Sequence, residues 1–128
     1  MPQYMLLIYG SSVRTPSPEE MAAAMPRWND YTQSLQDAGV MRAGDALHGP
    51  ESATTVRVRG GETQFTDGPF AETKETLGGY YLIECEDLDT ALGHAARMPN
   101  IDSGSVEVRP VVDFSGDRAA GAEASSTA

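Results

Sequence analysis

Cysteine is nearly absent from this 128-residue chain, in which Cys85 is the single thiol. One cysteine cannot form an internal disulfide, and it cannot hold a zinc ion by itself. Only His48 and His94 could join it, and neither has the tight ligand spacing of a metal site. The glycine pair at 78–79 lacks the G-x-G-x-x-G pattern of a nucleotide loop. We therefore expect neither a metal nor another cofactor.

Basic residues are also scarce, with nine Lys and Arg against nineteen Asp and Glu, which gives a net charge of −10. Such a chain repels polyanions, so nucleic acid is not an expected partner. The longest apolar run, Tyr4 to Tyr9, is far shorter than the roughly 20 residues that cross a bilayer. No charged and apolar signal region precedes it. We therefore expect a cytoplasmic protein without membrane contact.

The residues that are present fit a single domain of strands and helices. Residues 3–9 are rich in aromatic and branched side chains and too few for a helix, which predicts a buried strand. The sequence Ser-Pro-Glu-Glu at 17–20 is a capping box and predicts a helix that ends at Gly39. Pro26 lies inside this helix and predicts a kink or a break near Met25.

The rest of the chain predicts a strand, a hairpin, a strand, a helix and a strand. The strand lies at 40–47 with a bulge at Gly44, and the hairpin lies at 54–66 with a Gly60-Gly61 turn. The next strand lies at 78–85, the helix at 87–98 and the last strand at 105–109. This order gives an α+β fold, a ferredoxin-like βαββαβ protomer with an inserted β-hairpin. Its sheet has one uncovered face, which predicts a homodimer closed into an α+β barrel. The domain spans 1–112, and the composition of 113–128 predicts a disordered acidic tail.

One segment, residues 65–82, has a distinctive sequence: Phe-Thr-Asp-Gly-Pro-Phe-Ala-Glu-Thr-Lys-Glu-Thr-Leu-Gly-Gly-Tyr-Tyr-Leu. It resembles the DGPF-type members of the YCII-related family, and the resemblance extends over residues 3–112. The resemblance implies a dimeric α+β barrel but no established reaction. Some relatives look like small-molecule enzymes that use a His–Asp pair, whose acidic position falls on Asp67. This chain has no histidine before His48, so His48 would have to reach the pocket from another direction.

Asp67 and His48 are accordingly the candidate catalytic residues. Asp67 is either a general base or substrate anchor, or the residue that forms a turn with Gly68 and Pro69. His48 either transfers a proton with Asp67 or makes only a local hydrogen bond at a loop end. The expected function is a cofactor-free lyase or isomerase step on a small organic molecule. The alternative is a non-catalytic module that binds a small ligand or another protein.

Four further residues are candidates for substrate binding. Lys74, the single lysine of the chain, could bind an anionic group, and Glu72 could take a proton, or both could belong to a solvated loop. Phe70 is an aromatic of the core or of the pocket wall. Tyr80 and Tyr81 point to opposite faces of a strand, so one packs under the helices and the other lies in the barrel, depending on register.

Overall fold

The computed structural model describes residues 1–11, 17–69, 74–101 and 103–114 of the chain. Of the predicted tail, only Asp113 and Phe114 lie within these ranges. The tail's disorder and the domain boundary at 112 therefore remain predictions.

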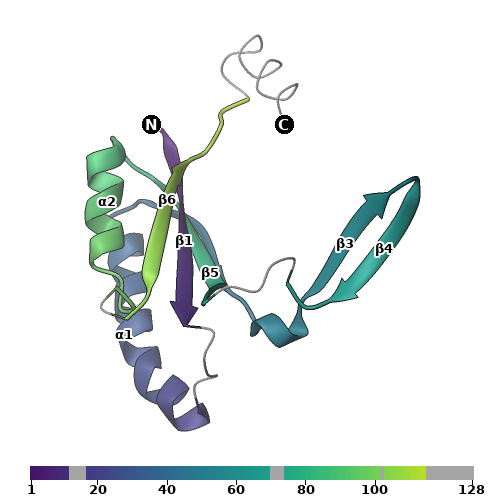
Figure 1. The fold of residues 1–128 in the computed structure, drawn as a ribbon. Coiled ribbons are helices and arrows are strands. Elements are labelled where there is room, and N and C mark those ends of the chain that lie inside the picture. Colours follow the sequence, from purple (N-terminus) through teal and green to yellow (C-terminus); the bar gives the residue numbers. More distant parts are fainter. Residues whose placement is uncertain (12–16, 70–73, 102, 115–128) are drawn as a thin grey trace.

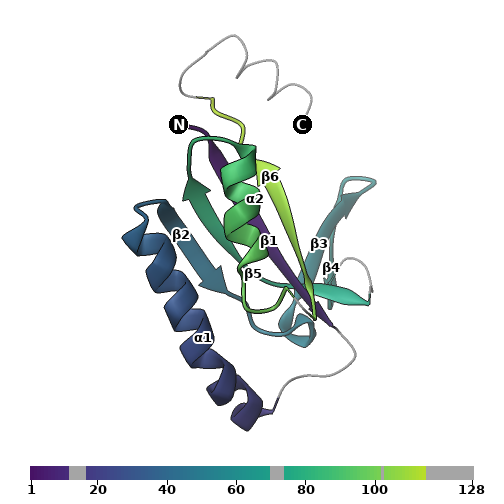
Figure 2. The same cartoon turned by 90° about the vertical axis from the view of Figure 1, so that its left-hand side faces the viewer.

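The described residues form a four-stranded antiparallel sheet with two helices on one face (Figures 1 and 2). The strand order is β2-β5-β1-β6. The strands are β1 (Gln3–Ser11), β2 (Met41–Ala46), β5 (Glu75–Glu84) and β6 (Ser105–Pro110), and the helices are α1 (Pro18–Asp37) and α2 (Leu88–Ala96). This arrangement confirms the predicted ferredoxin-like α+β fold.

The hydrophobic core lies between the sheet and the helices. Alternate residues of the central strands, among them Leu6 and Ile83, are buried there, because successive side chains of a strand point to opposite faces. Leu35 of α1 and Ala91 of α2 close the core from the helix side. The other sheet face carries Met5, Leu7 and Leu82, which remain partly exposed. We call this second surface the open face.

The register decides the roles of the two neighbouring tyrosines. Tyr81 is buried under α1, where its ring packs edge-on against Tyr31 with 5.5 Å between centroids. Its hydroxyl lies 2.6 Å from that of Thr32. Tyr80 pairs with Leu7 on the open face and donates a hydrogen bond to Asp45.

Helix α1 begins where the sequence predicts. Ser17 accepts a hydrogen bond from the Glu20 amide, and Glu20 accepts one from the Ser17 amide. Gly39 follows the helix with a φ of 74°, a conformation that favours glycine. Of the predicted kink or break near Met25, the break is wrong, because α1 continues through Pro26, and the kink stays a prediction. Proline's fixed φ fits a helix, and its cost is mainly one lost backbone hydrogen bond and a local clash.

The predicted bulge at Gly44 is also wrong. The register shift in β2 lies between Met41 and Ala43, so Arg42 is the extra residue. Gly44 has a packing role instead, because a Cβ atom there would lie 2.8 Å from the Tyr81 ring. The β1–β5 pairing has a second irregularity, in which Ile8 pairs with Gly79 but Tyr9 pairs with Leu77.

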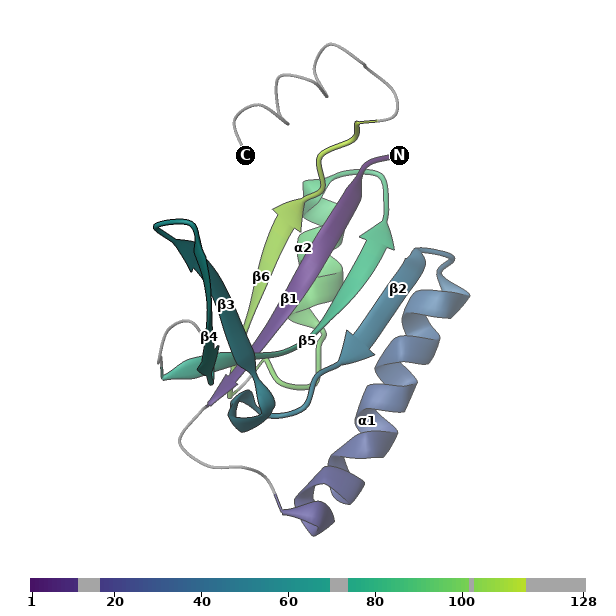
Figure 3. The same ribbon diagram turned by 90° about the vertical axis from the view of Figure 1, so that its right-hand side faces the viewer.

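The predicted hairpin forms a separate two-stranded sheet of β3 (Thr54–Arg59) and β4 (Glu62–Asp67). Gly60 and Gly61 make the turn with φ values of 59° and 81°. A short 3-10 helix, η1 (Pro50–Ser52), precedes it. The hairpin projects from the open-face side of the body, opposite the helices (Figures 1 and 3).

We expect Cys85 to be inert towards a disulfide reagent such as Ellman's reagent in the native protein at pH 8. Its side chain is 2% exposed, and burial raises the pKa of the thiol, so little thiolate forms. The absorbance of the thiolate released from the reagent should show almost no reaction in buffer. In guanidinium it should show one reacted thiol per chain. Full reaction of the native protein within minutes would contradict this placement.

Candidate functional site

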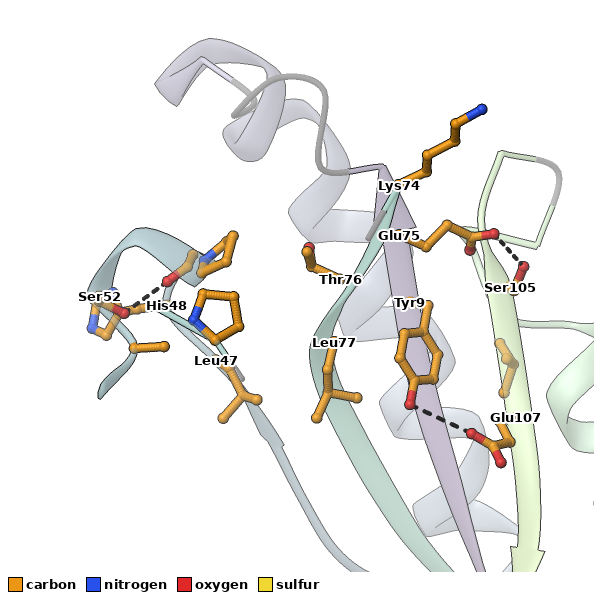
Figure 4. A pocket seen from close by; sticks show the side chains of 15 residues that line it. Tyr9, Leu47, His48, Ser52, Lys74, Glu75, Thr76, Leu77, Ser105 and Glu107 are labelled. Carbon is orange, nitrogen blue, oxygen red and sulfur yellow. Dashed lines mark hydrogen bonds between the residues drawn. The ribbon is translucent and has the colours of Figure 1, made fainter. Parts of the chain in front are cut away.

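An open cleft of about 1040 Å³ lies where the open face meets the connection between β2 and β3 (Figure 4). One wall comes from the end of β1 and the beginnings of β5 and β6. The other wall comes from residues 47–53. The contributing residues are far apart in sequence, so the tertiary fold creates this cleft.

Antiparallel pairing explains the first wall. Strands β5 and β6 both begin beside the end of β1, so Tyr9 pairs with Leu77 on one side and Ser105 on the other. The irregularity next to Gly78 keeps Leu77 on the same face as Tyr9. Leu77 adds apolar surface to this wall.

The second wall is a backbone segment that is tied to β5 at one end and forms a local 3-10 turn at the other. The Leu47 amide donates a hydrogen bond of 2.8 Å to the Gly78 carbonyl, which ties the end of β2 to β5. Beyond His48, Ser52 donates from its amide and its hydroxyl to the Gly49 carbonyl. His48 therefore sits between the anchored Leu47 and a local turn, with its side chain exposed at the cleft.

Polar groups of β1, β5 and β6 line the side of the cleft opposite His48 (Figure 4). The Tyr9 hydroxyl donates to Glu107 Oε1 at 3.4 Å, and Arg109 Nε donates to Glu107 Oε2 at 2.6 Å. The Glu107 carboxylate raises the pKa of Arg109 through this bond. A second pair joins the Ser105 hydroxyl to Glu75 at 3.2 Å. Glu107 is thus an oriented carboxylate that lines the cleft, with its side chain 40% exposed.

Sequence reasoning did not single out Glu107. The alternating pattern of residues 105–109 places it on the face opposite Val106 and Val108, which was a usable signal. That pattern alone could not show which face would border a cleft.

Two of the predicted site residues, His48 and Lys74, line the cleft. The Lys74 side chain extends away from Tyr9 and the cleft interior in Figure 4. Tyr80 lies farther along the open face and is not among the described residues of the lining. The hydrogen bond to Asp45 raises the pKa of Tyr80.

Asp67 is the last residue of β4 and is exposed at the foot of the hairpin. The next residue, Gly68, has a φ of 97° and donates its amide to the Ala53 carbonyl at 2.7 Å. Pro69 then reaches the cleft lining. Asp67 therefore precedes a bend at Gly68 beside the cleft, and its catalytic role stays a prediction.

The other two predicted residues, Phe70 and Glu72, lie outside the described residues. Within the described ranges, no group of three or more His, Cys, Asp or Glu side chains could hold a metal ion. None of the helices in those ranges is long and apolar enough to cross a membrane.

His94, the second histidine, belongs to α2 and lies apart from the described cleft lining. Arg97 approaches its Nδ1 at 2.8 Å. Burial, with a smaller contribution from the Arg97 charge, lowers the pKa of His94. Its surroundings are those of a packed helix residue.

The sequence of the chain matches a known domain family and a relative in a bacterium. The family model of the YCII-related domain matches residues 2–115. A relative in Rhizobium meliloti (strain 1021), the uncharacterised protein R00369, is 39% identical over 112 residues. The match covers 84% of this chain and 90% of that protein.

Proposed function

The chain belongs to the YCII-related family, and its relative R00369 in Rhizobium meliloti carries no named activity, so we propose a function from the cleft. The protein binds a small organic molecule there and moves a proton on it without a cofactor, in a lyase or isomerase step. The observation that carries this proposal is the cleft itself, where a histidine and an oriented carboxylate lie on opposite sides of an apolar surface.

The composition of the cleft supports a small-molecule ligand. Leu47 and Leu77 offer apolar contact, and a few polar groups stand around them. Small-molecule sites typically combine a mostly apolar lining with a few placed polar groups, in volumes of roughly 300–1,000 Å³. The cleft, at about 1040 Å³, is large enough for such a ligand.

The arrangement of polar groups supports proton transfer. An imidazole can give or take a proton near neutral pH, so His48 suits an acid or a base. A carboxylate on the other side can remove a proton from a substrate carbon, while His48 returns one at a second position or protonates a leaving group. Glu107 is placed for the first task, and Asp67 and Glu72 are the carboxylates that the sequence predicts for it.

The open face supports the homodimer. Met5, Leu7 and Leu82 are apolar and remain partly exposed on it. Two such faces bury each other when two sheets pack together, which is the α+β barrel that the sequence predicts. In that dimer the cleft lies at the edge of the shared interior.

A thermal-shift screen with small acids, lactones and phenols tests ligand binding. A ligand at about 100 times its Kd adds about 2.7 kcal/mol to the stability and raises the Tm by roughly 10 °C. Leu77→Gln in the cleft should abolish the shift. Leu92→Gln is the matched control, because Leu92 has a similar exposed fraction but belongs to α2 (39% against 46%). Equal shifts in both variants would place the ligand elsewhere.

For a ligand that wild type converts, His48→Gln should lower turnover about 10²–10⁴-fold while leaving Kd nearly unchanged. Glu107→Gln and Asp67→Asn then show which carboxylate acts, because only the base should produce a comparable loss. Mass spectrometry or NMR of the ligand gives the rates. Tight binding without conversion by wild type would favour the non-catalytic ligand-binding alternative.

A further inference from the structure

The β3–β4 hairpin has one strongly exposed apolar surface. Val56 is 56% exposed, Val58 is 59% exposed, and Phe65 is 72% exposed. Val56 pairs with Phe65 across the two strands, and Val58 lies two residues along from Val56, so all three share one side of the ribbon. We call these three residues the apolar side of the hairpin. Arg57 and Gln64 form a pair on the opposite side.

The hairpin leaves this apolar side without cover from its own body. It pairs with no strand of the main sheet, and it projects away from the open face (Figures 1 and 3). The bond from the Gly68 amide to the Ala53 carbonyl closes the base of the hairpin and continues its own β3–β4 pairing. A two-stranded hairpin alone is marginally stable in water, and exposed apolar strands invite association. The apolar side of the hairpin is therefore open to contact with another surface.

The size of the open face favours a second copy of this chain as the surface that covers the hairpin. Four strands spaced about 4.8 Å apart over about 20 Å give a face of roughly 400 Å². A standard interface buries about 800 Å² on each partner, so the open face alone supplies about half. The two-stranded hairpin offers roughly 200 Å² more and covers an equal area of whatever receives it. A dimer with exchanged hairpins reaches the standard size.

We propose that the β3–β4 hairpin is a dimerisation arm whose apolar side packs on a second copy of this chain. The inference rests on the proposed homodimer and names the surface that makes it stable. The arm of each protomer packs on the other protomer, because a two-fold axis repeats every contact. The hairpin projects on the side where the open face would meet the partner, so the arm can extend past that contact onto the second copy.

Phe65→Glu tests the arm, and Gln64→Glu is its matched control. Both changes add one negative charge to the same strand, but Phe65 belongs to the apolar side and Gln64 to the opposite side. Sedimentation equilibrium should show a wild-type dimer at micromolar concentration and a Kd raised about 30-fold or more in Phe65→Glu. Gln64→Glu should remain within about threefold of wild type. An unchanged Kd in Phe65→Glu would overturn the proposal while leaving the open-face dimer intact.

A photo-crosslinking phenylalanine analogue at position 65 provides a test that does not require a destabilising change. Irradiation of the purified protein should give a covalent species of twice the monomer mass, with position 65 joined to a peptide of the second chain. A crosslink within one chain would mean that the arm folds back on its own body, which overturns the proposal. A monomeric wild type at about 100 μM would also overturn it. That result would leave the Leu77→Gln ligand test unaffected, so the two failures are distinguishable.

Discussion

Leu35→Ala should lower the free energy of unfolding by about 2–5 kcal/mol, because it removes a fully buried side chain and leaves a cavity. Leu35 and Tyr31 are the buried residues of α1, so this long helix rests on few core contacts. A domain of this size has a total stability of about 5–15 kcal/mol. The loss is therefore large enough to release α1 from the sheet in a marginal background.

Guanidinium unfolding followed by far-ultraviolet circular dichroism measures this loss. Leu92→Ala is the matched control, since it makes the same chemical change in α2 at a side chain that is 46% exposed. We expect a loss below about 1 kcal/mol there, because surface substitutions rarely cost more. Similar losses in both variants would show that Leu35 does not anchor α1.

Gly104→Ala should lower the free energy of unfolding by about 1–3 kcal/mol and also distort the cleft. Gly104 immediately precedes β6, and a Cβ atom there would overlap the carbonyl oxygen of Tyr9. The side-chain amide of Asn100 already donates a hydrogen bond to that oxygen at 3.2 Å. The backbone of β6 would have to move away from β1 and carry Ser105 and Glu107 with it.

Gly93→Ala is the control for this change, because a Cβ atom at Gly93 meets open space on α2. Alanine is a better helix former than glycine, so this variant should gain about 0.5–1 kcal/mol. Guanidinium unfolding gives both stabilities, and the thermal-shift ligand reports the state of the cleft. If Gly104→Ala bound that ligand as wild type does, the proposed coupling between this turn and the cleft would be wrong.

Much of the fold follows from local signals. The capping box of Ser17 and Glu20 and the positive-φ turn at Gly60 and Gly61 act over a few residues, and the structure confirms both. The break allowed at Pro26 and the bulge at Gly44 are wrong, and both concern irregularities within elements that are otherwise correct. A break or a bulge depends on what packs around it, and sequence spacing does not contain that information.

The candidate site likewise contains residues that the sequence predicts and a residue that only the strand pairing brings there. The family resemblance, with its His–Asp pair, led to His48, and the motif at residues 65–82 led to Lys74; both line the cleft. It did not indicate Glu107, which reaches the cleft because β6 pairs with β1 beside Tyr9. Long-range register brings these groups together, and a single sequence shows alternation but not which strands pair.

By itself, the sequence determined the elements, their order and the ferredoxin-like class, because capping, turn formation and alternation are local properties of the chain. The tertiary structure decided that Tyr81 faces the helices and Tyr80 the open face, because α1 docks on one side only. It also decided that the hairpin stands away from the sheet, with Phe65 exposed. Both outcomes depend on which surfaces pack against each other. The free energy of burying those surfaces is gained only when segments distant in the sequence come together.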